Sequence, residues 1–172
     1  MGKLQGKVAL VTGASRGIGR GIAAAFAGEG CDLLLSARKA EPLEELAADL
    51  ARSAGVRAIA HVADVADEEA VAELFATLRA QFGRLDLLVN NAGAFDGAPL
   101  DAFPLEAWDR VLSTNLRGPF LCTRAALQLM KPQREGRIIN IGSISAQRVR
   151  PHSAAYSASK HGLWGLSQVT AL

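Results

Sequence analysis

Short apolar runs alternate with longer helical segments along the whole chain, and this alternation limits the possible folds more than any other feature. The runs typical of buried strands are residues 7–12, 32–37, 56–62, 85–90 and 137–142. The predicted helices are residues 17–29, 41–54, 67–82, 104–131 and 154–172. Because parallel strands need helical crossovers, the pattern predicts an α/β fold with a doubly wound parallel sheet and helices on both faces. With 172 residues, 49% of them hydrophobic, one domain can bury a sizeable core.

A glycine-rich turn follows the first predicted strand. Glycines stand at Gly13, Gly17 and Gly19, directly before an alanine-rich helical stretch. A backbone without side chains can approach a pyrophosphate closely, and the start of a helix presents free N–H groups to an anion. The spacing G-x3-G-x-G differs from the usual dinucleotide fingerprint G-x-G-x-x-G. We expect a dinucleotide to bind at this turn, with a tight turn that holds no ligand as the alternative.

Small or polar residues follow the carboxyl end of every predicted strand. In doubly wound sheets, ligands bind in the crevice outside these ends. The residues are Gly13, Arg38, Asp64, Asn91, Gly93 and Ser143. Because the carboxyl ends of parallel strands meet at one edge of the sheet, we expect these residues to line one crevice.

A second motif, S-x12-Y-x3-K, consists of Ser143, Tyr156 and Lys160. Tyr156 and Lys160 lie four residues apart on a predicted helix and therefore share a face. A nearby ammonium favours the phenolate form of a tyrosine, so Tyr156 can exchange a proton with a carbonyl or alcohol oxygen. Ser143 would hydrogen-bond the same oxygen. The alternative makes Tyr156 a half-buried packing residue and Lys160 part of a solvated helix face.

Asn115 lies in the predicted helix 104–131, four residues before Pro119. Proline has no N–H, so the carbonyl of residue 115 loses its helical partner. A buried carbonyl needs a donor, and a water molecule is a natural one. We predict that such a water links Asn115 to Lys160 and begins a proton path to solvent. A simple proline kink is the alternative.

The end of the second predicted strand bears on the choice of nicotinamide cofactor. An acidic residue there would bind a ribose 2′-hydroxyl, whereas an arginine accommodates a 2′-phosphate. The segment holds Arg38 and no acid between residues 33 and 40, and Arg16 stands in the glycine turn. These residues favour NADP(H), with NAD(H) as the second choice. Either arginine could instead be an ordinary surface charge.

Other function classes find little support. The net charge is +2, and the basic residues are scattered, so the sequence argues against nucleic acid and against a membrane surface. The two cysteines form no disulfide framework, and no His, Asp or Glu cluster has metal-ligand spacing. No secretory signal or membrane span is visible, so we expect a cytoplasmic protein. A serine hydrolase is disfavoured because Ser143 lacks the G-x-S-x-G context and no Asp follows it.

Together these motifs resemble the classical short-chain dehydrogenase/reductase family. The matches are the T-G-x3-G-x-G turn, the N-N-A-G segment at residues 90–93, Asn115, Ser143 and Tyr156-x3-Lys160. The resemblance implies a Rossmann-type fold, NAD(P) binding and the catalytic set Asn115, Ser143, Tyr156 and Lys160. The local sequence around these motifs is similar to that of the 3-oxoacyl-carrier-protein reductase and polyol dehydrogenase branches. The implied substrate is a small carbonyl compound or alcohol.

The resemblance also implies which residues contact the cofactor. Asp64 and Val65 would flank the adenine, and Lys160 would hydrogen-bond the nicotinamide ribose as well as assist Tyr156. The full implied set is Gly13, Ser15, Arg16, Gly17, Ile18, Gly19, Arg38, Asp64, Val65, Asn91, Ala92, Gly93, Tyr156 and Lys160.

Substrate and assembly are less constrained. Residues 144–155 connect Ser143 to Tyr156 and should border the substrate. Their polar and basic side chains suit an anionic substrate, with a solvated loop as the alternative; they are Gln147, Arg148, Arg150 and His152. Residues 116–130 and 161–172 are rich in apolar side chains. The resemblance implies that they pack against another subunit in a homodimer or homotetramer.

The chain length accounts for five strand–helix units at roughly 30 residues each. We therefore expect residues 1–172 to form a single domain that is incomplete at the C-terminus, with the C-terminal strands absent. By resemblance, the missing part would supply the last strands and a substrate lid. A fifth strand without a sixth would present an unpaired edge. The alternative function is accordingly a catalytically weak nucleotide-binding fragment or interaction protein.

Overall fold

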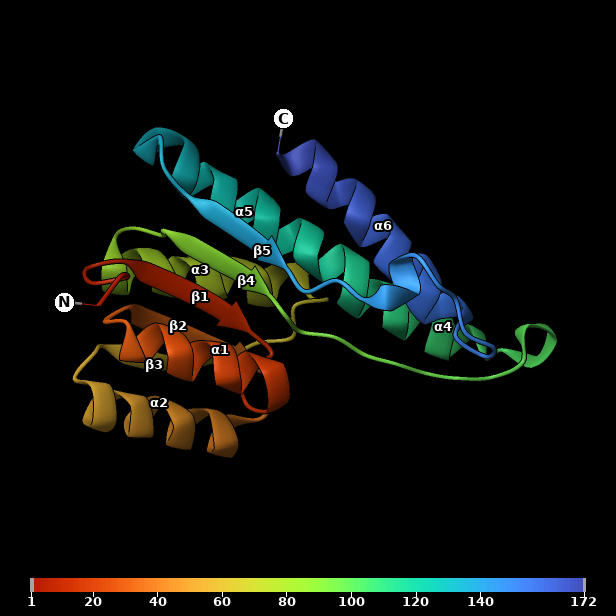
Figure 1. The fold of residues 1–172 in the computed structure, drawn as a ribbon, viewed down its shortest axis with the longest axis horizontal. Helices are drawn as coiled ribbons and strands as arrows, with labels where there is room; N and C mark the ends of the chain where they lie inside the picture. Colours follow the sequence, from red (N-terminus) through yellow and green to blue (C-terminus); the bar gives the residue numbers. More distant parts are fainter. Residues whose placement is uncertain (1, 172) are drawn as a thin grey trace.

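The computed structural model describes residues 2–171 as a five-stranded parallel sheet flanked by helices (Figure 1). The strands are β1 (Val8–Thr12), β2 (Asp32–Ala37), β3 (Ala58–Val62), β4 (Leu87–Asn90) and β5 (Arg137–Asn140). They lie in the order β3-β2-β1-β4-β5, and each neighbouring pair is parallel. This is the doubly wound arrangement, because the chain winds outward from β1 in both directions. The predicted Rossmann-type α/β fold is confirmed.

Two hydrophobic cores cover the two faces of the sheet. Helices α1 (Gly17–Gly28) and α2 (Ala40–Ala54) pack on one face, and α3 (Glu68–Phe82) and α5 (Gly118–Gln133) pack on the other. Successive strand residues point to opposite faces. Accordingly, Ala9 and Val11 of β1 lie in the first core, whereas Val8 and Leu10 lie in the second. Every residue of β1 is buried, which explains why Val8–Val11 are all apolar rather than alternating with polar residues.

Helix α6 (Ala154–Thr170) carries the predicted tyrosine and lysine and packs on α4 (Leu105–Leu112). The connections that follow β4 and β5 both run past the carboxyl end of the sheet towards α4 and the start of α6 (Figure 1). They include two short 3-10 turns, η1 (Leu100–Ala102) and η3 (Ile144–Ala146). The last residue of the predicted helix 154–172, Leu172, lies outside the described residues.

The predicted helix 104–131 corresponds to an unbroken helical run over residues 105–133, but its middle is not an α-helix. Helix α4 and helix α5 are separated by a π-helical turn, η2 (Ser113–Arg117), in which the N–H of Gly118 donates to the carbonyl of Ser113, five residues back. Pro119 follows directly and has no N–H to donate. The widened turn accommodates the helical hydrogen bond that proline removes.

Strand β5 lies at one edge of the sheet, as β3 does at the other. Within residues 2–171, β5 pairs with β4 alone. Arg137 is exposed and the next three residues are half-buried, in contrast to the fully buried β1.

The amino end of the sheet is closed by charged groups around Asp86. Its carboxylate accepts hydrogen bonds from the backbone N–H of Val8 at 2.9 Å and from Arg84 at 2.6 and 2.9 Å, and Lys7 Nζ lies at 3.3 Å. The Asp86 side chain is only 4% exposed. Burial by itself raises the pKa of this carboxyl, but the hydrogen bonds from Arg84, Val8 and Lys7 outweigh it and hold the pKa below its usual value.

Candidate active site

The glycine turn between β1 and α1 leaves no room for side chains at two of its three glycines. Gly13 has φ +63°, and a Cβ atom there would lie 2.8 Å from the Cα of Ala92. A Cβ atom at Gly19 would lie 2.4 Å from Nδ2 of Asn91. At Gly17, with φ +55°, nothing stands within 4 Å of that position, so the backbone faces open space at the start of α1. This is the geometry in which an anion can approach backbone N–H groups.

Thr12 and Asn91 join this turn to the segment after β4. Thr12 Oγ1 accepts from the N–H groups of Asn91 and Ala92 at 3.0 and 3.1 Å, and it donates to the carbonyl of Val89 at 3.2 Å. Asn91 Nδ2 donates to the carbonyls of Thr12 and Gly13, each at 3.0 Å. The structure therefore brings Gly13 and Asn91 together, as expected for one crevice. The sequence analysis assigned no role to the Thr12 side chain.

Arg38 and Asp64 lie side by side beyond the ends of β2 and β3. One guanidinium nitrogen of Arg38 is 3.8 Å from Oδ2 of Asp64, and the two side chains are 69% and 42% exposed. Such an exposed pair is weak, so the guanidinium is free to exchange partners. Val65 is buried next to Gly118, and its contact with the adenine stays a prediction. Arg16 is exposed at the first cap position of α1, next to Ser15 and before Ile18.

Tyr156 and Lys160 share one face of α6, as their spacing predicts. Lys160 Nζ lies 5.6 Å from the centroid of the Tyr156 ring and donates to the carbonyl of Ile141 at 2.7 Å. The Lys160 side chain is buried, and this desolvation lowers the pKa of its amine. Ser143 caps η3, with its Oγ accepting from the N–H of Ser145 at 3.1 Å. Tyr156 itself is half-buried.

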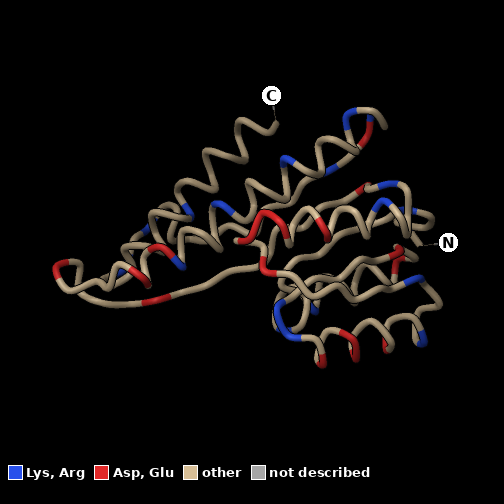
Figure 2. The backbone as a smooth tube through the Cα atoms, turned by 180° about the vertical axis from the view of Figure 1, so that it is seen from behind, with Lys and Arg blue, Asp and Glu red and all other residues tan. Residues whose placement is uncertain are grey.

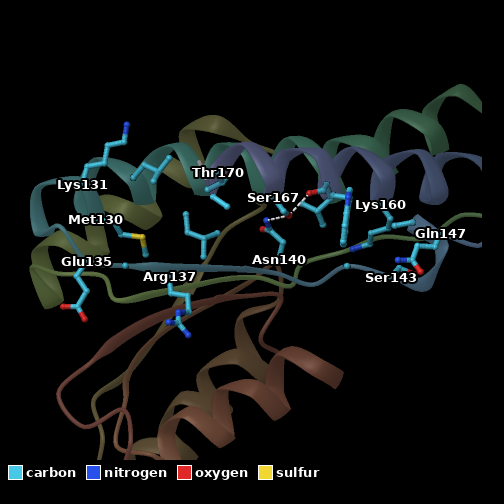
Figure 3. A pocket seen from close by; sticks show the side chains of 18 of the residues that line it. Met130, Lys131, Glu135, Arg137, Asn140, Ser143, Gln147, Lys160, Ser167 and Thr170 are labelled. Atoms are coloured by element: carbon cyan, nitrogen blue, oxygen red, sulfur yellow. Dashed lines mark hydrogen bonds between the residues drawn. The ribbon is translucent and has the colours of Figure 1, made fainter.

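A cavity of about 790 Å³ extends from Ser143 and Lys160 along β5 between α5 and α6 (Figure 3). Inside it, Asn140 Nδ2 donates to Ser167 Oγ at 2.9 Å, which links β5 to α6. Tyr156 is not among the residues that line this cavity. The space therefore borders the site from the side of Lys160 and follows β5, which within residues 2–171 pairs with β4 alone.

Asn115 is buried in the π-helical turn, and its side chain joins three segments. Its Oδ1 accepts from the N–H of Ala94 at 2.7 Å, and its Nδ2 donates to the Ala94 carbonyl at 2.9 Å and to Ser159 Oγ at 3.1 Å. Ser159 Oγ in turn donates to the carbonyl of Tyr156 at 2.7 Å. Asn115 thus holds the loop after Gly93 against the helix that carries Tyr156. The predicted water between the carbonyl of residue 115 and Lys160 stays a prediction.

Two further contacts of the site were missed by sequence reasoning. The ring of Phe95 meets the ring of Tyr156 edge-on, with centroids 5.5 Å apart and an interplanar angle of 70°. The N–H of Ala98 donates to the carbonyl of His152 at 3.2 Å, which ties the connection after β4 to the connection after β5. Neither contact has a sequence motif. The contact of Ser159 with Asn115 could have been predicted in part, because a residue three positions after Tyr156 lies near the same helix face.

Four further features of the described residues concern metal ligands, cysteine thiols, membrane-spanning helices and the distribution of charge. Within residues 2–171, no group of three or more His, Cys, Asp or Glu is placed to hold a metal ion. Burial raises the pKa of both cysteine thiols, Cys31 and Cys122, to about 12. No described helix combines the length and apolar character needed to cross a membrane. Basic and acidic residues are interspersed over the fold rather than separated by sign (Figure 2).

Comparisons with known proteins agree with this geometry. The profile of the short chain dehydrogenase family matches residues 7–172. An uncharacterized oxidoreductase of Bacillus subtilis is 41% identical over 166 residues, and the alignment covers 96% of this chain and 64% of that protein. A 3-oxoacyl-[acyl-carrier-protein] reductase of Synechocystis is 41% identical over 172 residues, covering 99% and 69% respectively. The chain therefore spans about two thirds of the length of these curated relatives.

Two solved structures superpose closely on the chain. A metagenomic short-chain oxidoreductase in complex with NADP has a TM-score of 0.92 and 40% identity, and the match covers 96% of this chain and 75% of that one. An alcohol dehydrogenase from Thermococcus sibiricus, complexed with 5-hydroxy-NADP, has a TM-score of 0.92 and 33% identity, covering 95% and 69%.

Proposed function

This chain belongs to the short-chain dehydrogenase family, and we propose that it transfers a hydride between a nicotinamide dinucleotide and a carbonyl compound or secondary alcohol. The observation that carries the proposal is the placement of Tyr156. Its ring lies 5.6 Å from the ammonium of Lys160, on the helix that Asn115 fastens to the loop after β4. The open backbone at Gly17 fits the phosphates of the dinucleotide, because no side chain stands in their way.

The proposed chemistry divides one reduction between the cofactor and this chain. The nicotinamide, when bound, supplies the hydride that goes to the carbonyl carbon. The hydroxyl of Tyr156 gives its proton to the carbonyl oxygen, so that the C=O bond becomes an alcohol and the tyrosine becomes a phenolate. Lys160 favours that phenolate through its positive charge. Ser143 holds the reacting oxygen by donating a hydrogen bond to it. Oxidation of an alcohol uses the same groups in reverse.

We assign NADP(H) as the preferred cofactor, with NAD(H) as the weaker one. Arg38 stands exposed at the end of β2, where the 2′-position of the ribose is recognised in this fold. Its present partner, Asp64, is 3.8 Å away and exposed, so a 2′-phosphate can compete for the guanidinium. The NADP-containing relatives support the assignment by likeness. Arg16, at the cap of α1, is the second candidate for the same phosphate.

A second candidate function is nucleotide binding with weak catalysis. The observation that favours it is the cavity beside Ser143 and Lys160, which within residues 2–171 lies open along β5. Exclusion of water strengthens electrostatic catalysis, so an open site would be a poor one.

A homodimer or homotetramer is part of the proposal too, because two large apolar side chains are exposed on neighbouring helices. Phe120 on α5 is 46% exposed and Trp164 on α6 is 59% exposed.

The test is a measurement of cofactor oxidation at several carbonyl compounds, with NADPH and NADH compared, alongside calorimetric binding of both nucleotides. We expect NADPH to bind more tightly and to be oxidised in a ketone-dependent reaction. Tight binding without turnover would favour the second candidate. Absence of both binding and turnover would contradict the assignment.

A further inference from the structure

We propose that Phe95 determines substrate specificity by holding an apolar group next to the reacting carbonyl. The substrate class would then be ketones with an aromatic or bulky apolar substituent, together with the corresponding secondary alcohols. This inference rests on the proposed function, in which Tyr156 exchanges a proton with the substrate oxygen.

The position of the Phe95 ring is the first argument. Its edge-to-face contact with Tyr156, at 5.5 Å between centroids, uses only part of the ring, and Phe95 remains 63% exposed. A single exposed apolar side chain is ordinary on a protein surface. This one, however, touches the group that we expect to protonate the substrate. We therefore expect that a carbonyl oxygen in reach of Tyr156 places its nearest substituent close to the free surface of Phe95.

The rigidity of the backbone around Phe95 is the second argument. On one side, Ala94 is held through both its N–H and its carbonyl by the side chain of Asn115. On the other side, Ala98 donates to the carbonyl of His152. A Cβ atom on Gly97 would lie 3.5 Å from the Phe95 ring, so the chain turns back closely around it. A backbone that is already held in place loses little freedom when a ligand packs on the side chain that it carries.

The chemistry of the neighbouring loop is the third argument. Ile144 and Val149, in the connection between Ser143 and Tyr156, are 60% and 68% exposed and add apolar surface on that connection. A polyol bound here would place hydroxyl groups against Phe95, where the ring offers them no hydrogen-bond partner. Apolar substituents have no hydrogen bonds to lose in this position, and they gain contact with the ring. Arg148 and Arg150 lie in the same connection, and both are exposed. Because these two guanidinium groups are solvated, we take the apolar contact with Phe95, rather than a contact with a charge, as the feature that selects the substrate.

The experiment compares two methyl ketones that differ in one substituent, acetophenone with a phenyl group and hydroxyacetone with a polar one. In the full chain with NADPH, we expect Phe95→Ala to lower kcat/KM for acetophenone about tenfold relative to hydroxyacetone. Phe95→Leu, which keeps apolar volume without a flat ring, should lower the same ratio about threefold. The matched control is Leu100→Ala, which removes another exposed apolar side chain from the same connection and should leave the ratio unchanged.

A second readout does not depend on turnover. Saturation-transfer NMR with 1-phenylethanol should show ligand contact in the wild type and a weaker signal in Phe95→Ala. Circular dichroism checks that each variant folds, and if Phe95→Ala does not fold, the ratio in Phe95→Leu decides.

An unchanged ratio in a folded Phe95 variant would overturn the inference. So would a wild type that reduces hydroxyacetone but not acetophenone, a result that leaves the proposed function intact. A wild type that reduces neither ketone, and whose NADPH oxidation does not respond to any other carbonyl compound, contradicts the proposed function and this inference with it.

Discussion

The two ends of the parallel sheet use polar groups in opposite ways. At the amino end, Asp86 is buried and has Arg84, Lys7 and the N–H of Val8 as partners. At the carboxyl end, Arg38 and Tyr156 remain partly exposed, and the buried polar groups join loops to one another instead. Charge at the first end holds strands together, whereas charge at the second end is available to a ligand. Substitutions at the two ends should therefore separate stability from activity.

The largest effect is expected at the carboxyl end, from Tyr156→Phe. Removing the hydroxyl removes the proton donor, so turnover should fall by about a thousandfold, within the usual range for general acid–base groups. Because the hydroxyl lies on a half-buried ring, the free energy of unfolding should change by less than about 0.5 kcal/mol. Steady-state kinetics and urea unfolding measure the two quantities. A large loss of stability would show that the two ends are not independent.

The opposite pattern is expected from Asp86→Ala at the amino end. Losing the carboxylate leaves Arg84 and the N–H of Val8 without their partner, so the free energy of unfolding should fall by about 3 kcal/mol. Turnover per folded molecule should stay at the wild-type level. Asp49→Ala is the control, because the Asp49–Arg52 pair is exposed on α2 and should contribute far less. Equal destabilisation by both variants would contradict the special role of the buried site.

The same carboxyl predicts a dependence of stability on pH. The folded state holds the pKa of Asp86 below its unfolded value of about 3.9. Its contribution is therefore fully present above that value and is lost as the pH falls through the lower, folded pKa. Urea unfolding between pH 7 and pH 2.5 should show the difference between wild type and Asp86→Ala narrowing below about pH 4. A difference that stays constant down to pH 2.5 would argue against ionisation of Asp86 as the cause.

A smaller effect is expected at the carboxyl end of the sheet from Arg38→Asp, which should change the preference for the cofactor. The substitution replaces the guanidinium by a carboxylate, which repels a 2′-phosphate and accepts a hydrogen bond from a ribose hydroxyl. The ratio of kcat/KM for NADPH to that for NADH should fall at least about tenfold. Lys39→Asp makes the same charge change one residue later and should move the ratio less. If both variants shift it equally, overall charge rather than position 38 selects the cofactor.

Most of the fold could be predicted because it depends on local pattern. The apolar run at residues 7–12 corresponds to β1, and the alternation of runs and helices requires a parallel sheet. The π-helical turn at Ser113–Arg117 could not be predicted in the same way. Pro119 indicates that one hydrogen bond is lost, but whether the helix kinks or widens depends on what packs around it.

The candidate site also combines features that local sequence pattern predicts with features that depend on packing. The spacing of Tyr156 and Lys160 predicts a shared helix face, and the structure places them so. The pairing of Asn115 with Ala94 and of Phe95 with Tyr156 depends on where the connection after β4 meets η2 and α6. No periodicity in the sequence encodes such a meeting, because it is set by the packing of α6 on α4.

The hydrogen bond between Ala98 and His152 has a consequence for engineering this chain. The two connections that it joins leave different strands, and the bond joins backbone atoms, so a chimera that imports only one of them from a relative keeps the bond only if the imported segment follows the same path. Exchanging both connections as a pair should preserve it, and substrate range is then altered by transplanting two segments at once.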